Sequence, residues 1–312
     1  MTQKKIEKLT DLSGVGETTA EKLTAGGLGE LLSIAVSTPV LIAEKSGMTE
    51  AKARLIIQEA RDACEFGFST ATQMKKDKAS LIRIPTGSKQ LDTLIGGGIE
   101  ATVITEACGK FGSGKSQLAQ QLCVNIQKMD KKFKAIYIDT ENSFRANRIE
   151  QMAQAVGLDT EKVLENIQVV NVFNSDHQMF MVDQAEDIIK KDPNVRLLVV
   201  DSIIDHFRHE FAGRGQLADR QAKLNKHIHT LLRIAQMYHI AVYITNQVME
   251  DPAMMYGDPV KAAGGNILSH CIRYRIYMRK STKGITAKLT KSPDVADGEV
   301  IIQVTGEGIR DE

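Results

Sequence analysis

Tryptophan is absent from this chain of 312 residues, and the chain has only six prolines and 5% aromatic residues. No uninterrupted apolar run approaches the ~20 residues that cross a bilayer. The opening "MTQKKIEKLTDL" has no apolar segment of the kind a secretory signal needs. We therefore expect a cytoplasmic protein with no membrane partner. Four cysteines lie far apart without a C-x-x-C pair, which argues against disulfides and zinc and for reduced thiols: Cys64, Cys108, Cys123 and Cys271.

Charge is balanced overall but uneven along the chain. The net charge is +1, with 42% hydrophobic and 25% charged residues, which is ordinary for one large core and a small extra domain. The segment from Pro259 to Pro293 nevertheless holds eight basic residues and no acid, whereas the tail from Asp294 is mostly acidic. Such a segment binds phosphates or forms a solvated strand face, and charge alone does not decide between the two.

Residues 1–64 predict a small all-helical domain. In "DLSGVGETTAEKL", Gly14 and Gly16 form a hairpin before a helix that starts at Glu17. A second unit, "EKSGMTEAKARLIIQEARDAC", turns at Gly47 and continues as a helix from Thr49. Hairpins of this kind bring backbone N–H groups to DNA phosphates in helix-hairpin-helix modules, but the glycines can equally serve only to shape the turn.

Residues 65–80 are polar and charged, and we interpret them as a linker between two domains. Phe68 is out of place there, because a linker offers an aromatic ring no core. The ring packs back on one of the domains or docks on a neighbouring molecule, where its burial would contribute ~1.5–3 kcal/mol.

From residue 81 to residue 312 the pattern is that of an α/β core. The runs "ATVITEA", "KAIYIDTE", "RLLVVDS" and "IAVYITNQ" are separated by helix-like stretches long enough for right-handed crossovers, which predicts parallel strands. "CIRYRIYMRK", "ITAKLTK" and "GEVIIQVT" follow one another closely and predict an antiparallel edge. In the long helix-like stretch "LADRQAKLNKHIHTLLRIAQMYH", we expect His227 and His229 on the helix surface rather than on a metal.

The stretch "GKFGSGKS" over residues 109–116 fits the phosphate-binding pattern G-x-x-x-x-G-K-[S/T] between a strand and a helix. In this pattern Lys115 neutralises phosphate oxygens and the Ser116 hydroxyl ligates Mg²⁺, with Asp201 at the end of "LLVVDS" holding the magnesium shell. The predicted ATP contacts in the loop are Gly109, Lys110, Phe111, Gly112, Ser113, Gly114, Lys115, Ser116 and Gln117.

Two further strand ends predict hydrolysis rather than binding alone. Glu141, after "AIYIDT", can polarise a water for attack on the γ-phosphate. Gln247, in "ITNQ", can sense that phosphate with its amide. With Lys115, these two residues form the predicted catalytic set.

Several long motifs together resemble the archaeal RadA recombinases, relatives of bacterial RecA. They are "TEACGKFGSGKSQ", "AIYIDTENSFRANRIEQMA", "LLVVDS", "HFRHEFAGRGQLADRQAKLNKH", "ITNQV" and "GGNILSH", and the resemblance covers nearly the whole chain. It implies a RecA-like core behind a helix-hairpin-helix domain. It also implies a DNA-dependent ATPase that forms a filament on single-stranded DNA and exchanges strands with a homologous duplex. ATP and Mg²⁺ would bind between protomers, and a ring without DNA is a second assembly left open.

The resemblance also implies roles for individual residues. Arg148 matches an arginine that stacks on adenine, and His270 matches a histidine between the nucleotide and the second DNA-binding loop. Phe68 and Ala71 of "FSTA" match the two anchors of a polymerisation motif. The implied DNA contacts are Arg208, Arg214 and Arg220 in a first loop and Met254, Met255 and Tyr256 in a second, the latter by insertion or base stacking.

The chain departs from this family at several places. Asn142, Ala146 and Asn147 replace a glycine, a proline and a glutamate near the adenine site. In "KLTKSPDVADGE", Lys291 replaces an aspartate that helps to hold a monovalent cation over the neighbouring subunit's ATP. Our hypothesis is that Lys291 replaces this cation in trans, and the alternative places it in solvent. The residues assigned to this contact are Lys291, Pro293, Asp294 and His270.

Two alternative functions remain from the sequence. A paralogous mediator would bind ATP and DNA and assist another recombinase without exchanging strands. A structural DNA-coating protein would use ATP only as an assembly switch, but it would have no need of Glu141 as a positioned base. The intact set of motifs favours the recombinase.

Overall fold

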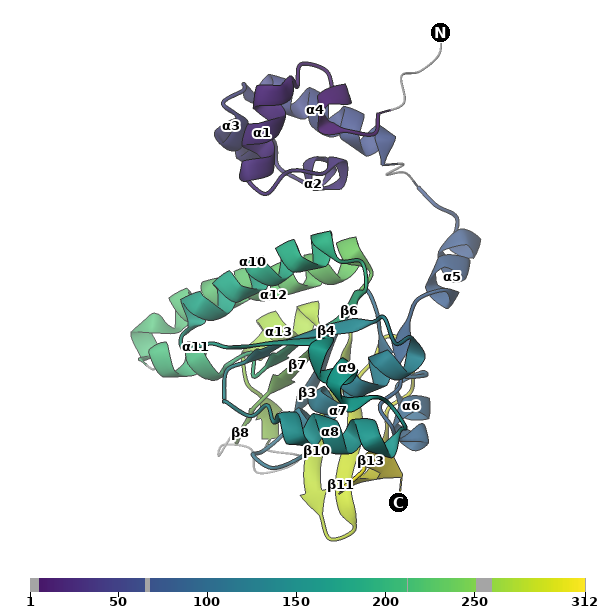
Figure 1. Ribbon diagram of the computed structural model, residues 1–312. Helices are drawn as coiled ribbons and strands as arrows, with labels where there is room; N and C mark the ends of the chain where they lie inside the picture. Colours follow the sequence, from purple (N-terminus) through teal and green to yellow (C-terminus); the bar gives the residue numbers. More distant parts are fainter. Residues whose placement is uncertain (1–5, 65–67, 212, 251–259, 312) are drawn as a thin grey trace. The chain divides into compact units, whose positions relative to one another are not determined.

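The computed structural model describes residues 6–64, 68–211, 213–250 and 260–311. The chain divides into two compact units, Met1–Ala79 and Ser80–Glu312 (Figure 1). None of the helices in the described ranges combines the length and apolar character that a membrane crossing requires.

The elements of the N-terminal unit, in the part that the structure describes, are all helices, as predicted. Threonine hydroxyls begin two of its helices: Thr38 accepts the Leu41 amide at 3.3 Å and Thr49 accepts the Lys52 amide at 3.4 Å. Gly47 ends the first of these two helices at a φ of 77°, where only glycine is comfortable. The elements are η1 (Leu9–Asp11), α1 (Glu17–Ala25), α2 (Leu31–Ala35), α3 (Pro39–Ser46), α4 (Glu50–Ala63) and α5 (Ala71–Ala79).

The segment predicted as a linker contains helix α5. The Thr70 hydroxyl accepts the amide of Gln73 at 3.2 Å at the start of this helix, and α5 has no buried residue. Phe68 and Ala71 both lie exposed in this segment. The polar composition concealed a helix because α5 has no apolar stripe to reveal its period.

The larger unit is built on a nine-stranded sheet with the order β13-β12-β11-β10-β3-β7-β6-β4-β5. The strands from β10 to β5 in this order pair in parallel, and β10 to β13 pair antiparallel. The seven predicted strands are therefore confirmed, and β5 and β13 add the two edges. The strands of this sheet are β3 (Ile104–Cys108), β4 (Lys134–Asp139), β5 (Ile167–Asn171), β6 (Val195–Asp201), β7 (Ala241–Asn246), β10 (Tyr274–Ser281), β11 (Gly284–Lys291), β12 (Gly298–Thr305) and β13 (Gly308–Asp311).

Two short ladders accompany the main sheet. One joins β1 (Arg83–Ile84) to β2 (Ile99–Glu100), and the other joins β8 (Val248–Glu250) to β9 (Val260–Ala262). Both strands of the second ladder lie within the segment predicted as the second DNA-binding loop, residues 248–265.

Helices cover both faces of the sheet (Figure 1). Alternate strand residues face opposite layers, so Tyr137 packs with α7 and α8 while Ile138 packs with α10 and α12. The helices of this unit are α6 (Lys89–Leu94), α7 (Lys115–Met129), α8 (Ala146–Ala155), α9 (Thr160–Glu165), α10 (Ser175–Lys191), α11 (Asp205–Glu210), η2 (Arg214–Gln216), α12 (Leu217–Tyr238) and α13 (Gly265–Cys271).

His227 is a core residue, and its predicted place on the helix surface was wrong. The side chain is 1% exposed, stacks on Phe207 with 5.6 Å between ring centroids, and lies 3.2 Å from the amide nitrogen of Gln178. Position 227 belongs to the same buried stripe of α12 as Leu224 and Leu231, which the sequence reading missed because it counted histidine as polar. His229 is exposed, as predicted.

Stability should depend on this ring. Burial lowers the pKa of His227 from 6.5 to about 3. Between these pH values His227 is protonated in the unfolded chain and neutral in the folded chain. The free energy of unfolding should therefore fall as pH is lowered from 6.5 towards 3, by about 1.4 kcal/mol per unit of pKa difference at most. Urea unfolding of His227→Gln should show a shallower acid-side loss than wild type. Exposed His209→Gln is the control, and equal slopes for His227→Gln and wild type would contradict the assignment.

Candidate nucleotide site

The loop between β3 and α7 depends on glycine for its shape. Gly112 and Gly114 adopt φ values of 74° and 89°. A Cβ at Gly109 would lie 2.1 Å from the backbone oxygen of Met278, and one at Gly114 would lie 2.6 Å from Ile285 Cδ1. The loop leads directly into the first turn of α7, whose amides have no acceptor within the helix. Together these features make an anion site.

Lys115 turns its ammonium back over this loop. Nζ donates to the carbonyl oxygens of Gly109 at 2.9 Å and Lys110 at 3.0 Å. Burial lowers the pKa of Lys115, and the carboxylates of Asp201 and Glu141 act in the opposite direction. The ammonium therefore lies among loop carbonyls and opposite two acids.

Asp201 ends β6 with a carboxylate fixed by hydroxyl groups from three elements. Oδ2 accepts from Tyr137 at 2.6 Å and from Ser143 at 2.8 Å, and Oδ1 accepts from Thr245. The side chain is 1% exposed. Asp201 and Ser116 line the same cavity of about 650 Å³, so the two predicted magnesium ligands are brought together.

Glu141 and Gln247 meet across the ends of β4 and β7. Gln247 Nε2 donates to Glu141 Oε1 at 3.2 Å and to Asp205 Oδ1 at 3.3 Å, while Arg208 Nη1 donates to Gln247 Oε1 at 3.1 Å. Burial raises the pKa of Glu141, against the hydrogen bond from Gln247. Glu141, Gln247 and Arg208 line, with Lys115, a cavity of about 590 Å³ beside the loop.

The turn that presents Glu141 depends on Asp139, which the sequence reading missed. The Asp139 carboxylate accepts the backbone amides of Glu141 at 3.2 Å, Ser143 at 3.0 Å and Phe144 at 2.8 Å. An aspartate followed by a polar turn is the available signal. Asn142, which replaces a glycine of the resembled family, adopts a φ of 52°. Asparagine tolerates this left-handed conformation better than most residues, so the turn keeps its shape.

Arg148 is held by its own chain. Its guanidinium donates to Gln117 Oε1 at 2.7 Å and to the carbonyls of Thr305 at 2.6 Å and Gly306 at 2.7 Å. The Arg148 side chain therefore joins α8 to the turn between β12 and β13. It also contacts Gln117, the last residue predicted to contact ATP in the phosphate-binding loop.

Lys291 is also engaged within the chain. Nζ donates to the carbonyl oxygens of Ser269 and, at 2.8 Å, Ile272, at the C-terminus of α13. Burial lowers the pKa of Lys291, with nearby Arg275 in the same direction. In this structure the Lys291 side chain is half-buried and hydrogen-bonded to its own chain. Asp294, which follows Pro293, accepts from the Tyr274 hydroxyl at 3.1 Å.

The predicted DNA contacts are described only in part. Arg220 is half-buried on α12. His270, which was assigned to the ATP contact in trans, is exposed in the last turn of α13. Arg214 begins η2, but its side chain lies outside the description, as do Met254, Met255 and Tyr256 in their entirety.

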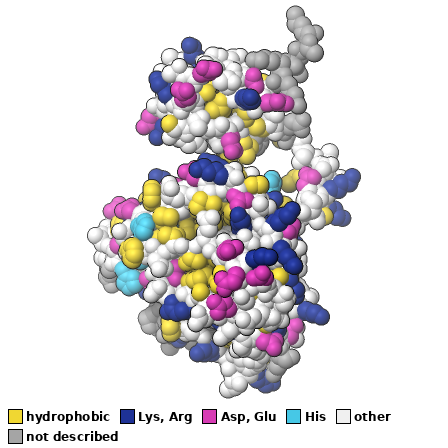
Figure 2. Space-filling model, in the orientation of Figure 1, with side chains coloured by type: hydrophobic (Ala, Val, Ile, Leu, Met, Phe, Trp, Pro, Cys, Tyr) yellow, Lys and Arg dark blue, Asp and Glu magenta, His cyan; other side chains and the backbone are white. Residues whose placement is uncertain are grey.

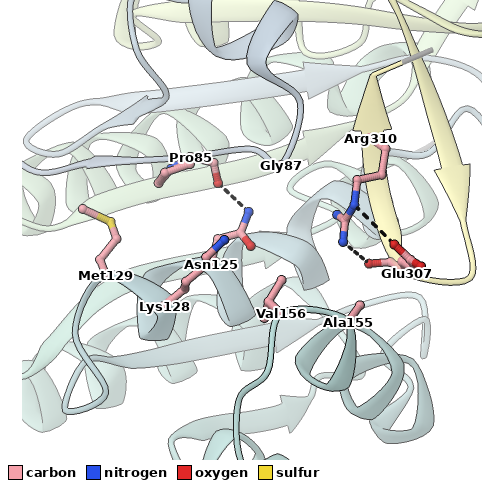
Figure 3. Close-up of a pocket in the computed structure, with 9 residues that line it drawn as sticks. All are labelled: Pro85, Gly87, Asn125, Lys128, Met129, Ala155, Val156, Glu307 and Arg310. Carbon is pink, nitrogen blue, oxygen red and sulfur yellow. Dashed lines mark hydrogen bonds and ion pairs between the residues drawn. The ribbon is translucent and has the colours of Figure 1, made fainter.

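A further cavity of about 650 Å³ lies around the C-terminal end of α7, which is the opposite end of that helix from the loop (Figure 3). Asn125 Nδ2 donates to the carbonyl of Pro85 at 2.6 Å there, and Arg310 Nε lies 3.9 Å from Glu307 Oε2. Asn125 thus points toward Pro85, and Arg310 points toward Glu307. None of the residues that line this cavity also lines the two cavities beside the phosphate-binding loop.

A mainly parallel sheet, a phosphate-binding loop after β3 and acidic residues at neighbouring strand ends define a RecA-like P-loop core. Comparison with known proteins agrees. The family profile described as "Rad51" matches residues 77–312, and that described as "SAM-like Helix-hairpin-helix tandem" matches residues 6–62. Two relatives are both named "DNA repair and recombination protein RadA". That of Metallosphaera sedula is 46% identical over 99% of this chain and 97% of its own length, and that of Aeropyrum pernix is 45% identical over 99% and 98%.

The chain therefore belongs to the Rad51 family, in its archaeal RadA branch.

Replacing Gly109 should damage the site through sterics alone. Gly109→Ala forces a Cβ against the β10 backbone, and we expect a loss of about 1–3 kcal/mol in the free energy of unfolding together with weaker binding of a non-hydrolysable ATP analogue. The matched control is Gly306→Ala, where an added Cβ meets nothing within 4 Å. Equal stability and binding for both variants would contradict the loop geometry.

Proposed function

We propose that this chain is a DNA-dependent ATPase that forms a helical filament on single-stranded DNA and catalyses homologous pairing and strand exchange in DNA repair and recombination. The observation that carries the proposal is the contact of Gln247 with Glu141 beside the phosphate-binding loop. A protein that only binds ATP has no use for a carboxylate positioned in this way. The names of the two relatives support the repair and recombination role.

In this proposal the loop amides and Lys115 bind the phosphates of ATP. Ser116 and Asp201 fit Mg²⁺, because they offer hard oxygen atoms and because three hydroxyl groups already fix the Asp201 carboxylate. When bound, Mg²⁺ supplies charge neutralisation at the phosphates. Arg148, which donates to Gln117, would stack on the adenine, as the matching arginine of the family does.

Glu141 acts as the general base in this proposal. Its carboxylate accepts a proton from the attacking water, and the pKa raised by burial brings it closer to working pH, where a base is most effective. Gln247 orients the carboxylate through Nε2 and can respond to the γ-phosphate on the same side.

We propose Arg214 and Arg220 as DNA phosphate contacts and Met254, Met255 and Tyr256 as base contacts, by similarity to the family. The third predicted arginine, Arg208, donates to Gln247 in this structure. The helical residues 1–64 would form an accessory DNA-binding domain, joined through residues 65–80 to the ATPase core of residues 81–312.

Strand exchange separates a recombinase from a mediator. The full chain with ATP and Mg²⁺ should join circular single-stranded DNA to a homologous linear duplex and produce exchanged products. Glu141→Gln, which keeps the shape of the side chain but removes the base, should still bind DNA and should not turn over ATP. DNA binding by the wild type without exchanged products would favour the mediator.

For polymerisation, we propose that Phe68 and Ala71 dock on the core of a second copy. The receiving surface, which we define as Val169, Phe173 and Phe180, lies at edge strand β5 and the start of α10. Its side chains are 41%, 79% and 56% exposed. Figure 2 shows hydrophobic side chains gathered on one face of the core unit. An unpaired sheet edge with exposed apolar residues is suited to a second copy.

Phe68→Glu should therefore abolish assembly while leaving the fold intact, because it places a charge in an apolar contact. Sedimentation with an ATP analogue should show loss of large assemblies, with unchanged unfolding by urea. The control is Met74→Glu, another exposed apolar residue of the same segment. Assemblies of wild-type size in Phe68→Glu would contradict the docking.

We propose that the Lys291 ammonium supplies the positive charge of a monovalent cation, and that it does so within its own chain rather than in trans. Its ammonium neutralises the C-terminal carbonyls of α13, the helix that carries His270. A reach by Lys291 itself to a neighbouring subunit would require breaking these hydrogen bonds, so His270, Pro293 and Asp294 are the remaining candidates for contact in trans.

ATP hydrolysis should then be equally fast in sodium, choline and potassium salts, because the positive charge is built in. Lys291→Asp should create a potassium requirement, whereas Lys288→Asp, on the exposed side of the same strand, should not. A strong potassium requirement in the wild type would remove the hypothesis.

A further inference from the structure

Helix α11 is firmly joined to the body of the core unit although it leads into the first predicted DNA-binding loop. Phe207 is fully buried against α12. Glu210, at the end of α11, accepts the Ser175 backbone amide at 2.6 Å and also its hydroxyl, at the start of α10. Lys223 of α12 donates to the same hydroxyl at 2.8 Å. Arg208 lies between these two attachments, so its backbone has a fixed position.

The Arg208 guanidinium faces a cavity of the site rather than only solvent. It is half-buried and lines the cavity of about 590 Å³ that also holds Lys115 and Glu141. Its Nη1 donates to Gln247 Oε1 at 3.1 Å. Arg208 therefore contacts Gln247, and Gln247 in turn contacts Glu141, the proposed base.

The chemistry of these groups fixes which way the Gln247 amide points. A guanidinium only donates hydrogen bonds and a carboxylate only accepts them. The amide oxygen must therefore face Arg208, and the amide nitrogen must face the carboxylates of Glu141 at 3.2 Å and Asp205 at 3.3 Å. Without Arg208, the oxygen loses the donor that holds it, and the two carboxylates hold the amide through its nitrogen alone.

We propose that Arg208 is a positioning residue for ATP hydrolysis: it holds the Gln247 amide in the orientation that donates to Glu141, rather than contacting a DNA phosphate. Because Arg208 belongs to α11, it also connects the entry of the first DNA-binding loop to the base. The inference rests on the proposed ATP hydrolysis and assigns a new role within the same site.

The test compares hydrolysis with DNA affinity in the full chain. Arg208→Ala should lower kcat at saturating single-stranded DNA by about tenfold and leave KM for ATP within about twofold, because it removes orientation rather than substrate contact. Arg208→Lys, which keeps a donor, should restore part of kcat. DNA affinity with a non-hydrolysable ATP analogue, and its dependence on salt, should match wild type. Lys226→Ala, an exposed cation on α12, controls for loss of one positive charge.

A double-mutant cycle isolates the route through Gln247. Adding Arg208→Ala to Gln247→Ala should cause no further loss of kcat, since the amide that Arg208 orients is already gone. Independent, multiplicative losses would overturn the inference. So would weaker DNA binding with a salt slope reduced by about one, at unchanged kcat, which is the signature of a phosphate contact. Absence of hydrolysis by the wild type would instead overturn the proposed function, and this inference with it.

Discussion

Parallel strands that end at one edge of a sheet determine where every part of the nucleotide site lies. β3, β7, β6 and β4 are neighbours in the sheet and run in the same direction. Their carboxyl ends lead to the phosphate loop, Gln247, Asp201 and Glu141, respectively. Residues more than a hundred positions apart therefore meet without any long-range motif in the sequence. This is the usual place for a ligand in an open α/β sheet.

The edge carries many buried polar groups, and each needs partners. The Asp201 carboxylate accepts hydrogen bonds from hydroxyl groups. Glu106, which is fully buried in β3 just before the loop, forms an ion pair with Arg275 of β10. Asn246 donates to Glu106 at 2.6 Å and to the carbonyl of Ala263 at 2.7 Å. The same network thus supports the strand before the loop and the chain that returns from the second predicted DNA-binding segment. The proposed ATP site and the predicted DNA-binding segment share this support.

Prediction from sequence succeeded where a feature is local and failed where it depends on distant partners. The glycine loop and the strand runs are short-range patterns, and they were enough to predict Glu141, Gln247 and Asp201 at the ends of strands. Nothing local shows that Arg208 would reach Gln247, or that Lys291 would reach the end of α13. His227 was misplaced for the related reason that its polarity outweighed its position on a helical stripe.

The measurement that tests the central claim most directly is ATP hydrolysis by the full chain with Mg²⁺, with and without single-stranded DNA. A site built at a sheet edge shared with the DNA-binding segments should hydrolyse ATP slowly alone and be strongly stimulated by DNA. Nucleotide binding with equal hydrolysis in the presence and absence of DNA would contradict the account, because the two functions would then be uncoupled.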